Sequence, residues 1–220
     1  MGKKCVIFGL TNMSRMLHYD LEHYAGVEVV AFTVDGAYRT EETFDGLPVV
    51  AFEECAGIYP PETHTMLICL GYKKMNRLRE EKANAAKAVG YELQGFIHPD
   101  AFVADNAVIG EGNIILEGVV VSYGAVIGDG NIIWNGCNIS HETVTGNYNH
   151  FSGGVTLGGL AKITNHCFFG MNSVISGGHT MGDSTLVGAL GFVNKDTEPY
   201  SVYVPGRTVK LEGKSSTELL

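Results

Sequence analysis

The sequence predicts a small α/β domain followed by a parallel β-helix, and two patterns carry this prediction. From Ile97 to residue 198 the chain reads as 17 hexads, and 16 of them begin with Ile, Val, Leu, Met or Phe. No helix has a six-residue period, and a plain strand alternates every two residues. A hexapeptide repeat is typical of a parallel β-helix. Before residue 97, apolar strands alternate instead with helical segments, which indicates a parallel sheet flanked by helices.

Three hexads form one coil of 18 residues, so the repeat also predicts which residues lie above one another. The first residue of each hexad points inward, and coils stack at about the strand spacing of 4.8 Å. Thr145 is the one inward position that is not apolar. Because the hexads follow one another without interruption, we expect no long loop to leave the β-helix. The predicted parts are residues 1–96, residues 97–198 and a tail at 199–220.

Each element of the first part has a local signal. Residues 4–8 form an apolar strand that ends at Gly9, and Asn12 or Ser14 could cap the helix that follows. The further elements expected are a strand at 28–34, a strand at 65–70 and an amphipathic helix at 73–89 whose buried side carries Leu78, Ala85 and Val89.

Ligands bind beyond the carboxyl ends of the strands in such a sheet. This edge is predicted to consist of Gly9 to Met13, Asp35, Gly71 and Tyr72. The stretch GLTNMS after the first strand is not G-x-G-x-x-G, so it does not predict a dinucleotide site. Asp35 could hold a ribose hydroxyl or cap the following turn, and the sequence favours neither.

Composition excludes several classes of function. The chain has 220 residues and a formal net charge of −9, which argues against a nucleic-acid-binding protein. No apolar run approaches the roughly 20 residues of a membrane span. The 5 cysteines are scattered and form no C-x-x-C pair, as expected for reduced thiols in a cytoplasmic protein.

His141 and Glu142 are predicted at a corner of the β-helix beneath a ridge without side chains. Counting in steps of 18, Tyr123 lies below His141, and Gly159 and Gly177 lie above it. A flexible chain such as pantetheine could lie along that ridge. His150 is half a coil away, so we expect it on another face. It could meet His141 only across an interface, for which a threefold arrangement is suited.

The chain resembles the PglD/NeuD-type sugar acyltransferases of the hexapeptide-repeat superfamily. The resemblance covers nearly the whole chain and lies in FIHPDAFV, SHETVTGNYNHFSGG, CFFGMNSVI and KDTEPYSVYVPGR. It implies a left-handed β-helix, a homotrimer, and acetyl-CoA bound between adjacent β-helices without a metal. It also implies a sugar acceptor, often nucleotide-linked, and a direct attack of the acceptor on the thioester.

The resemblance implies a role for each matching residue. His141 matches the general base, Glu142 the acidic residue that orients it, and His150 a second histidine near the thioester. The remaining matches fall into two groups. The positions expected to contact CoA are Gly159, Gly177, Met171, Ala189 and, for its phosphates, Arg207. The positions expected to contact the nucleotide part of the acceptor are Thr11, Asn12, Met13, Asp35, Gly71 and Tyr72.

Elementary chemistry is consistent with these roles. An acceptor amine or hydroxyl becomes a good nucleophile when a base takes its proton, and the usual histidine pKa of about 6.5 suits that task. N-acetylation of a 4-amino nucleotide-sugar and O-acetylation of a hexose both fit, and the His-Glu pair favours the amine by analogy with the family.

Two further classes use the same fold. A zinc hydratase requires two of its three histidine ligands close in sequence, which the spacings among His141, His150, His166 and His179 do not provide. A non-catalytic scaffold would not require the glycine ridge.

Overall fold

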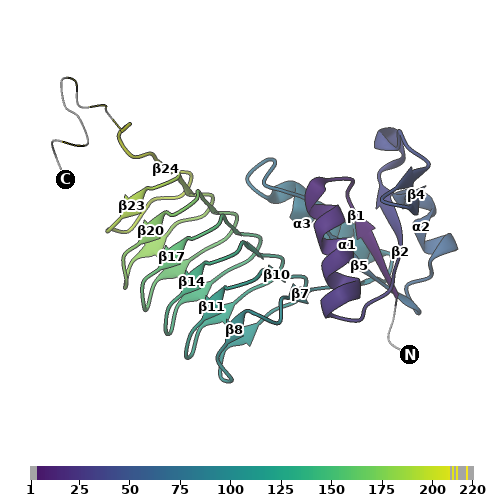
Figure 1. The fold of residues 1–220 in the computed structure, drawn as a ribbon, viewed down its shortest axis with the longest axis horizontal. Coiled ribbons are helices and arrows are strands. Elements are labelled where there is room, and N and C mark those ends of the chain that lie inside the picture. The colour runs from purple at the N-terminus through teal and green to yellow at the C-terminus, as the bar shows by residue number, and fades with distance from the viewer. Residues whose placement is uncertain (1–3, 209, 211, 213–216, 218–220) are drawn as a thin grey trace.

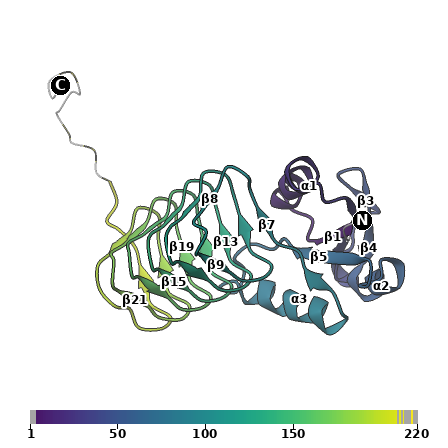
Figure 2. The ribbon, with the colours of Figure 1, turned by 90° about the horizontal axis from the view of Figure 1, so that it is seen from below.

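The computed structural model describes residues 4–208, 210, 212 and 217. An α/β domain lies at one end of the molecule, and a prism of stacked coils forms the rest (Figure 1). Helix α3 lies on the side of the α/β domain that faces the coils (Figure 2). Among the described residues, no helix combines the length and the apolar character needed to cross a membrane.

The α/β domain is built on a six-stranded sheet with the order β3-β4-β2-β1-β5-β6. All pairs are parallel except β3 with β4. The strands are β1 (Lys4–Phe8), β2 (Val29–Val34), β3 (Thr43–Phe44), β4 (Leu47–Ala51), β5 (His64–Ile68) and β6 (Glu92–Leu93). The helices are α1 (Asn12–Tyr24), the 3-10 turn η1 (Gly36–Tyr38), α2 (Phe52–Ile58) and α3 (Arg77–Ala88). The predicted strands at 4–8, 28–34 and 65–70 are confirmed to within two residues, whereas the segment before β5, for which no element was predicted, contains β3, β4 and α2.

The central strands are mostly apolar because helices cover both faces of the sheet. Cys5 and Ile7 pack with Leu17 of α1 on one face. Val6 packs with Cys55 of α2 and Ala83 of α3 on the other. Alternate residues of one strand therefore enter two different cores, and a continuous apolar run results.

Helix α1 begins at a capping box. The Thr11 hydroxyl accepts a hydrogen bond from the Ser14 N–H at 3.1 Å, and the Ser14 hydroxyl accepts one from the Thr11 N–H at 3.3 Å. The cap is therefore Thr11, and the expected cap at Asn12 or Ser14 was wrong. Asn12 and Met13, which were predicted at the ligand-binding edge of the sheet, belong to the first turn of the helix.

Helix α3 departs most from its prediction. Lys74, Met75 and Asn76 have positive φ angles, so the helix begins at Arg77 and not at residue 73. Its buried residues are Arg79, Ala83 and Ala86. The predicted buried positions Leu78 and Ala85 are only partly buried, and Val89 is 48% exposed. The buried side differs because α3 packs against both the sheet and the β-helix.

Two-residue strands stack into three parallel sheets, which form the faces of the prism. Face 1 contains β7 (Phe96–Ile97), β10 (Ile114–Ile115), β13 (Ile132–Ile133), β16 (His150–Phe151), β19 (Phe168–Phe169), β22 (Leu186–Val187) and β24 (Val202–Tyr203). Face 2 contains β8 (Phe102–Val103), β11 (Val120–Val121), β14 (Asn138–Ile139), β17 (Thr156–Leu157), β20 (Val174–Ile175) and β23 (Phe192–Val193). Face 3 contains β9 (Val108–Ile109), β12 (Val126–Ile127), β15 (Val144–Thr145), β18 (Lys162–Ile163) and β21 (Thr180–Met181).

The register confirms the predicted coil of 18 residues. Ile115 pairs with Ile133, and Ile133 pairs with Phe151. The first residues of the hexads form the central core, with Ile115, Ile133 and Phe151 fully buried. Thr145 also points into this core and is 2% exposed. Its hydroxyl has no hydrogen-bond partner among the described residues, which is unfavourable for a buried polar group.

A ladder of buried asparagines fixes the corner that leads into face 1. The Asn113 side chain accepts a hydrogen bond from the Asn131 N–H, and the Asn131 side chain accepts one from the Asn149 N–H, both at 2.8 Å. Asn149 in turn accepts one from the Cys167 N–H. The backbone on either side of His150 is therefore held by side chains as well as by strand pairing.

The β-helix extends past the predicted boundary at residue 198. Strand β24 pairs with β22 so that Tyr203 lies opposite Val187, 16 positions away instead of 18. The last coil is two residues short, so the hexad frame could not reveal this strand. The part of the predicted tail at 202–203 belongs to face 1, and Arg207 lies exposed beyond it.

Candidate functional site

His141 and Glu142 occupy the corner between β14 and β15, where face 2 turns into face 3. Glu142 takes a left-handed conformation with φ 54°, and its N–H donates to the Tyr123 carbonyl at 2.8 Å. This turn lets two adjacent side chains approach each other. His141 Nδ1 lies 3.4 Å from Glu142 Oε2, and both side chains are more than half exposed.

The glycines above His141 leave room for its ring. A Cβ atom added to Gly159 would lie 2.3 Å from His141 Nε2, so the imidazole rests directly over the Gly159 backbone. One coil further, a Cβ on Gly177 would lie 2.6 Å from the Gly159 carbonyl oxygen. The ridge is therefore bare and sterically closed to side chains, as the sequence predicted.

This corner has the parts of a general base. A proton on Nδ1 can be donated to the Glu142 carboxylate, which leaves the lone pair of Nε2 to accept a proton from a ligand.

A pocket of about 620 Å³ lies where face 1 meets the α/β domain. It gathers seven residues that the sequence analysis proposed for ligand binding: Thr11, Met13, Gly71, Tyr72, His150, Met171 and Ala189. Six further lining residues were not predicted from the sequence: Trp134, Asn135, Ser152, Gly153, Phe168 and Gly170. Counting in steps of 18 could have found most of these, because Asn135 and Gly153 lie in line with Met171 and Ala189, and Trp134, Ser152 and Gly170 lie in line with one another.

His150 lies in the wall of this main pocket. The outward-facing side chains of face 1 form a row, in which Ile132 lies one coil before His150. The α/β domain covers Ile114 and Ile132 in this row, and the pocket begins at His150. The ring of His150 stacks on Phe168 at 5.2 Å, and the ring of Tyr72 meets it edge-on at 5.4 Å.

Burial controls the charge of His150. The side chain is 5% exposed, and burial together with the nearby positive charge of Arg79 lowers its pKa to about 3. The imidazole is therefore neutral near pH 7. Its Nδ1 is buried and has no hydrogen-bond partner among the described residues.

Asp35 belongs to a second pocket, of about 340 Å³, at the carboxyl edge of the sheet. The Asp35 carboxylate accepts a hydrogen bond from Lys82 Nζ at 2.8 Å. Gly9, Lys73 and Lys74 also line this pocket. The Asp35 side chain does not cap η1, so the Asp35 carboxylate is free to bond with Lys82.

The expected site residues thus lie in three places within one chain. His141, Glu142, Gly159 and Gly177 lie at the edge between faces 2 and 3, the main pocket lies on face 1, and Asp35 lies in the second pocket. Asn12 and Arg207 are exposed and line neither pocket. Within the part of the chain that the structure describes, no three His, Cys, Asp or Glu side chains gather as metal ligands would.

No family model matches the chain. Its fold does match solved structures over most of its length. The acetyltransferase domain of PglB from Neisseria gonorrhoeae FA1090 is 24% identical, with a TM-score of 0.82, and the match covers 93% of this chain and 97% of that one. PerB from Caulobacter crescentus, in complex with CoA and GDP-perosamine, is 26% identical, with a TM-score of 0.83 and coverage of 92% and 94%.

The chain has the architecture of the hexapeptide-repeat sugar acetyltransferases. Its second part is therefore a left-handed β-helix, as the resemblance predicted. WeeI from Acinetobacter baumannii AYE has the same fold, with a TM-score of 0.76 at 18% identity and coverage of 92% and 97%. The match to each of these proteins spans the α/β domain as well as the β-helix.

Proposed function

We propose that this protein transfers the acetyl group of acetyl-CoA to an amino group of a nucleotide-linked sugar. The observation that carries the proposal is the full-length match to a perosamine N-acetyltransferase whose structure contains CoA and GDP-perosamine. The His141–Glu142 pair beneath a glycine ridge and the aromatic pocket around His150 supply the chemistry that such a transfer requires.

In the proposed mechanism, His141 acts as the general base. Its Nε2 takes the proton of the acceptor amine as the nitrogen attacks the thioester carbonyl carbon, and Glu142 stabilises the imidazolium. The Gly159 amide faces the carbonyl oxygen, where one such donor typically contributes about 3 kcal/mol to transition-state stabilisation. Neutral His150 bonds to the thioester end of the donor, and the thiolate of CoA leaves.

The two pockets suit the two ends of the acceptor. No lining residue of the main pocket carries a formal charge at neutral pH, so it fits the sugar ring and the acetyl group. Lys73, Lys74 and Lys82 line the second pocket, where their charges can bind the phosphates of a nucleotide. We place Asp35 at the nucleoside, and the loop with Gly71 and Tyr72 between the two pockets.

We further propose a homotrimer in which each site combines residues of two subunits. Cyclic symmetry can bring the His141 edge of one subunit to the His150 pocket of its neighbour and repeat the site three times. Apolar side chains stand exposed along faces 2 and 3 and support burial against another copy. These are Phe102, Val120, Val174 and Phe192 on face 2, and Val108, Val126 and Val144 on face 3.

Cytoplasmic location is part of the same proposal. All five cysteines are buried and unpaired, which is typical of proteins in a reducing compartment.

The proposal predicts that His141→Ala lowers kcat by at least about 100-fold without loss of the fold, because general-base catalysis contributes at least that much. The measurement is CoA release from acetyl-CoA with GDP-linked 4-amino and 4-hydroxy sugars, with the product identified by mass spectrometry. His23→Ala, which alters an exposed histidine of α1, is the control and should retain full activity. Near wild-type activity of His141→Ala would overturn the assignment of the base. Acetylation of the hydroxyl sugar alone would overturn the choice of an amine.

A further inference from the structure

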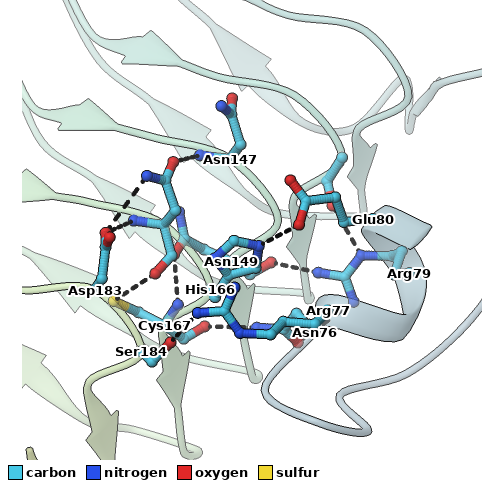
Figure 3. Close-up of polar contacts among 12 residues, drawn as sticks. Asn76, Arg77, Arg79, Glu80, Asn147, Asn149, His166, Cys167, Asp183 and Ser184 are labelled. Atoms are coloured by element: carbon cyan, nitrogen blue, oxygen red, sulfur yellow. Dashed lines mark hydrogen bonds and ion pairs between the residues drawn. The ribbon is translucent and has the colours of Figure 1, made fainter. Parts of the chain in front are cut away.

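Arg79 is the largest of the fully buried side chains, at 2% exposure. It extends from the first turn of α3 into the junction between the α/β domain and the β-helix (Figure 3). Among the described residues it forms no ion pair with a carboxylate, and burial lowers the pKa of its guanidinium to about 10. A charge buried in this way is unfavourable unless its hydrogen bonds are satisfied.

The guanidinium bonds to carbonyl groups on both sides of the junction. On the β-helix side, Nε donates to the Gly130 carbonyl at 2.9 Å and Nη2 donates to the Asn149 carbonyl at 3.0 Å. On the α/β side, Nη1 donates to the carbonyls of Leu70 and Gly71 at 3.2 and 3.1 Å. One rigid group therefore fixes the distance between two backbone segments.

These two segments carry the rings that face each other in the main pocket. Gly71 directly precedes Tyr72, and Asn149 directly precedes His150. The rings of Tyr72 and His150 meet edge-on at 5.4 Å, and both line the pocket. Arg79 therefore bonds to the backbone directly before each ring.

Attachment of α3 to the β-helix does not depend on Arg79 alone. Arg77 donates to the Ser184 hydroxyl at 3.2 Å, and Glu80 lies 2.8 Å from His166 Nε2 (Figure 3). Asn76 donates to the Cys167 carbonyl at 3.0 Å. These side-chain contacts hold the helix, and the Asn76 N–H also donates to the Tyr72 carbonyl at 3.3 Å. Arg79 differs from Asn76, Arg77 and Glu80 in that its side chain bonds to the carbonyls of both Leu70 and Gly71.

We infer that Arg79 is a positioning residue that holds Tyr72 against His150 and thereby shapes the wall of the main pocket. The kinetic consequence rests on the proposed function. Tyr72 comes from the α/β domain, where we place the acceptor, so loss of the constraint should weaken acceptor binding more than it slows the chemical step.

The test compares Arg79→Met and Arg79→Lys with the matched control Arg77→Met. Met removes all the bonds, and Lys keeps the charge but has a single nitrogen that cannot span both carbonyl pairs. Trp134 is the only tryptophan of the chain and lines the pocket, so its fluorescence reports on this site without any assay of activity. Circular dichroism and thermal unfolding establish that each variant is folded.

We expect the acrylamide quenching constant of Trp134 to rise about twofold in both Arg79 variants, because a loosened pocket wall exposes the indole to the quencher. In Arg77→Met the quenching constant should stay unchanged. We also expect KM for the sugar acceptor to rise at least about tenfold, with kcat and KM for acetyl-CoA changed by less than about threefold. If the protein proved not to be an acetyltransferase, the fluorescence result would still decide the inference.

Folded Arg79 variants with wild-type quenching would overturn the inference. Failure of both variants to fold while Arg77→Met folds would also overturn it, because Arg79 would then serve overall stability and not the pocket.

Discussion

At the scale of single residues, the candidate site depends on the absence of a side chain as much as on the presence of a histidine. The His141 ring occupies the space where a Cβ atom of residue 159 would lie. Gly159 has an ordinary φ angle, so its requirement for glycine comes from this contact and not from backbone strain. The ring is thereby held over the backbone amide that we place next to the thioester.

Gly159→Ala should therefore displace the His141 ring and lower kcat by about 10- to 100-fold, the cost of a misplaced catalytic group. The β-helix should still fold, because the added methyl group meets an exposed ring and not the core. Steady-state kinetics with thermal unfolding checks both points. Gly57→Ala, where an added Cβ meets nothing within 4 Å, is the control. Unchanged kcat in Gly159→Ala would contradict the close contact.

His150 is predicted to make stability depend on pH. Its folded-state pKa of about 3 lies below the usual histidine value of about 6.5, so between these values the unfolded chain binds a proton that the folded chain does not. The free energy of unfolding should therefore fall as the pH is lowered through this window. The contribution of His150 is about 1.4 kcal/mol per pH unit, or about 2 kcal/mol between pH 6.5 and pH 5.

Urea unfolding of the wild type and of His150→Phe at both pH values, at equal protein concentration, measures this difference. Phe keeps the ring stacked on Phe168 but does not titrate. We expect the variant to lose about 2 kcal/mol less than the wild type on acidification. Equal losses would show that His150 is not held neutral by burial.

At the scale of secondary-structure elements, much of the β-helix could be predicted because a fixed coil converts sequence spacing into position. The stacking of Tyr123, His141, Gly159 and Gly177 could be predicted from the 18-residue length of the coil alone. The prediction failed where the length of the coil changes. The last coil is two residues short, and strand β24 was therefore placed in the tail.

Helix α3 shows what periodicity cannot predict. Its pattern of apolar residues indicated Leu78, Ala85 and Val89 as the buried side. The three positive φ angles before Arg77 shift the start of the helix, and the helix faces two neighbours. A buried arginine that bonds to carbonyls has no signature in a hydrophobic pattern, because its partners are backbone atoms distant in sequence.

At the scale of the whole molecule, the main pocket exists because two parts meet. Its residues come from the start of α1, from the loop at Gly71 and Tyr72, and from four coils of the β-helix. A sequence can predict each part, but their contact depends on how the α/β domain docks, which Arg79 and its neighbours determine. Counting residues in coils of 18 correctly predicted that His141 and His150 lie on different sides of one β-helix.

In the proposed homotrimer, His141 of one subunit completes the pocket around His150 of the next. The most direct test co-expresses His141→Ala and His150→Ala with different affinity tags and measures acetyl transfer by the mixed trimers. If sites are shared, each trimer that contains both variants has both histidines at one of its three sites, so about a third of wild-type activity should return. Activity no higher than that of the two separate variants would contradict the claim.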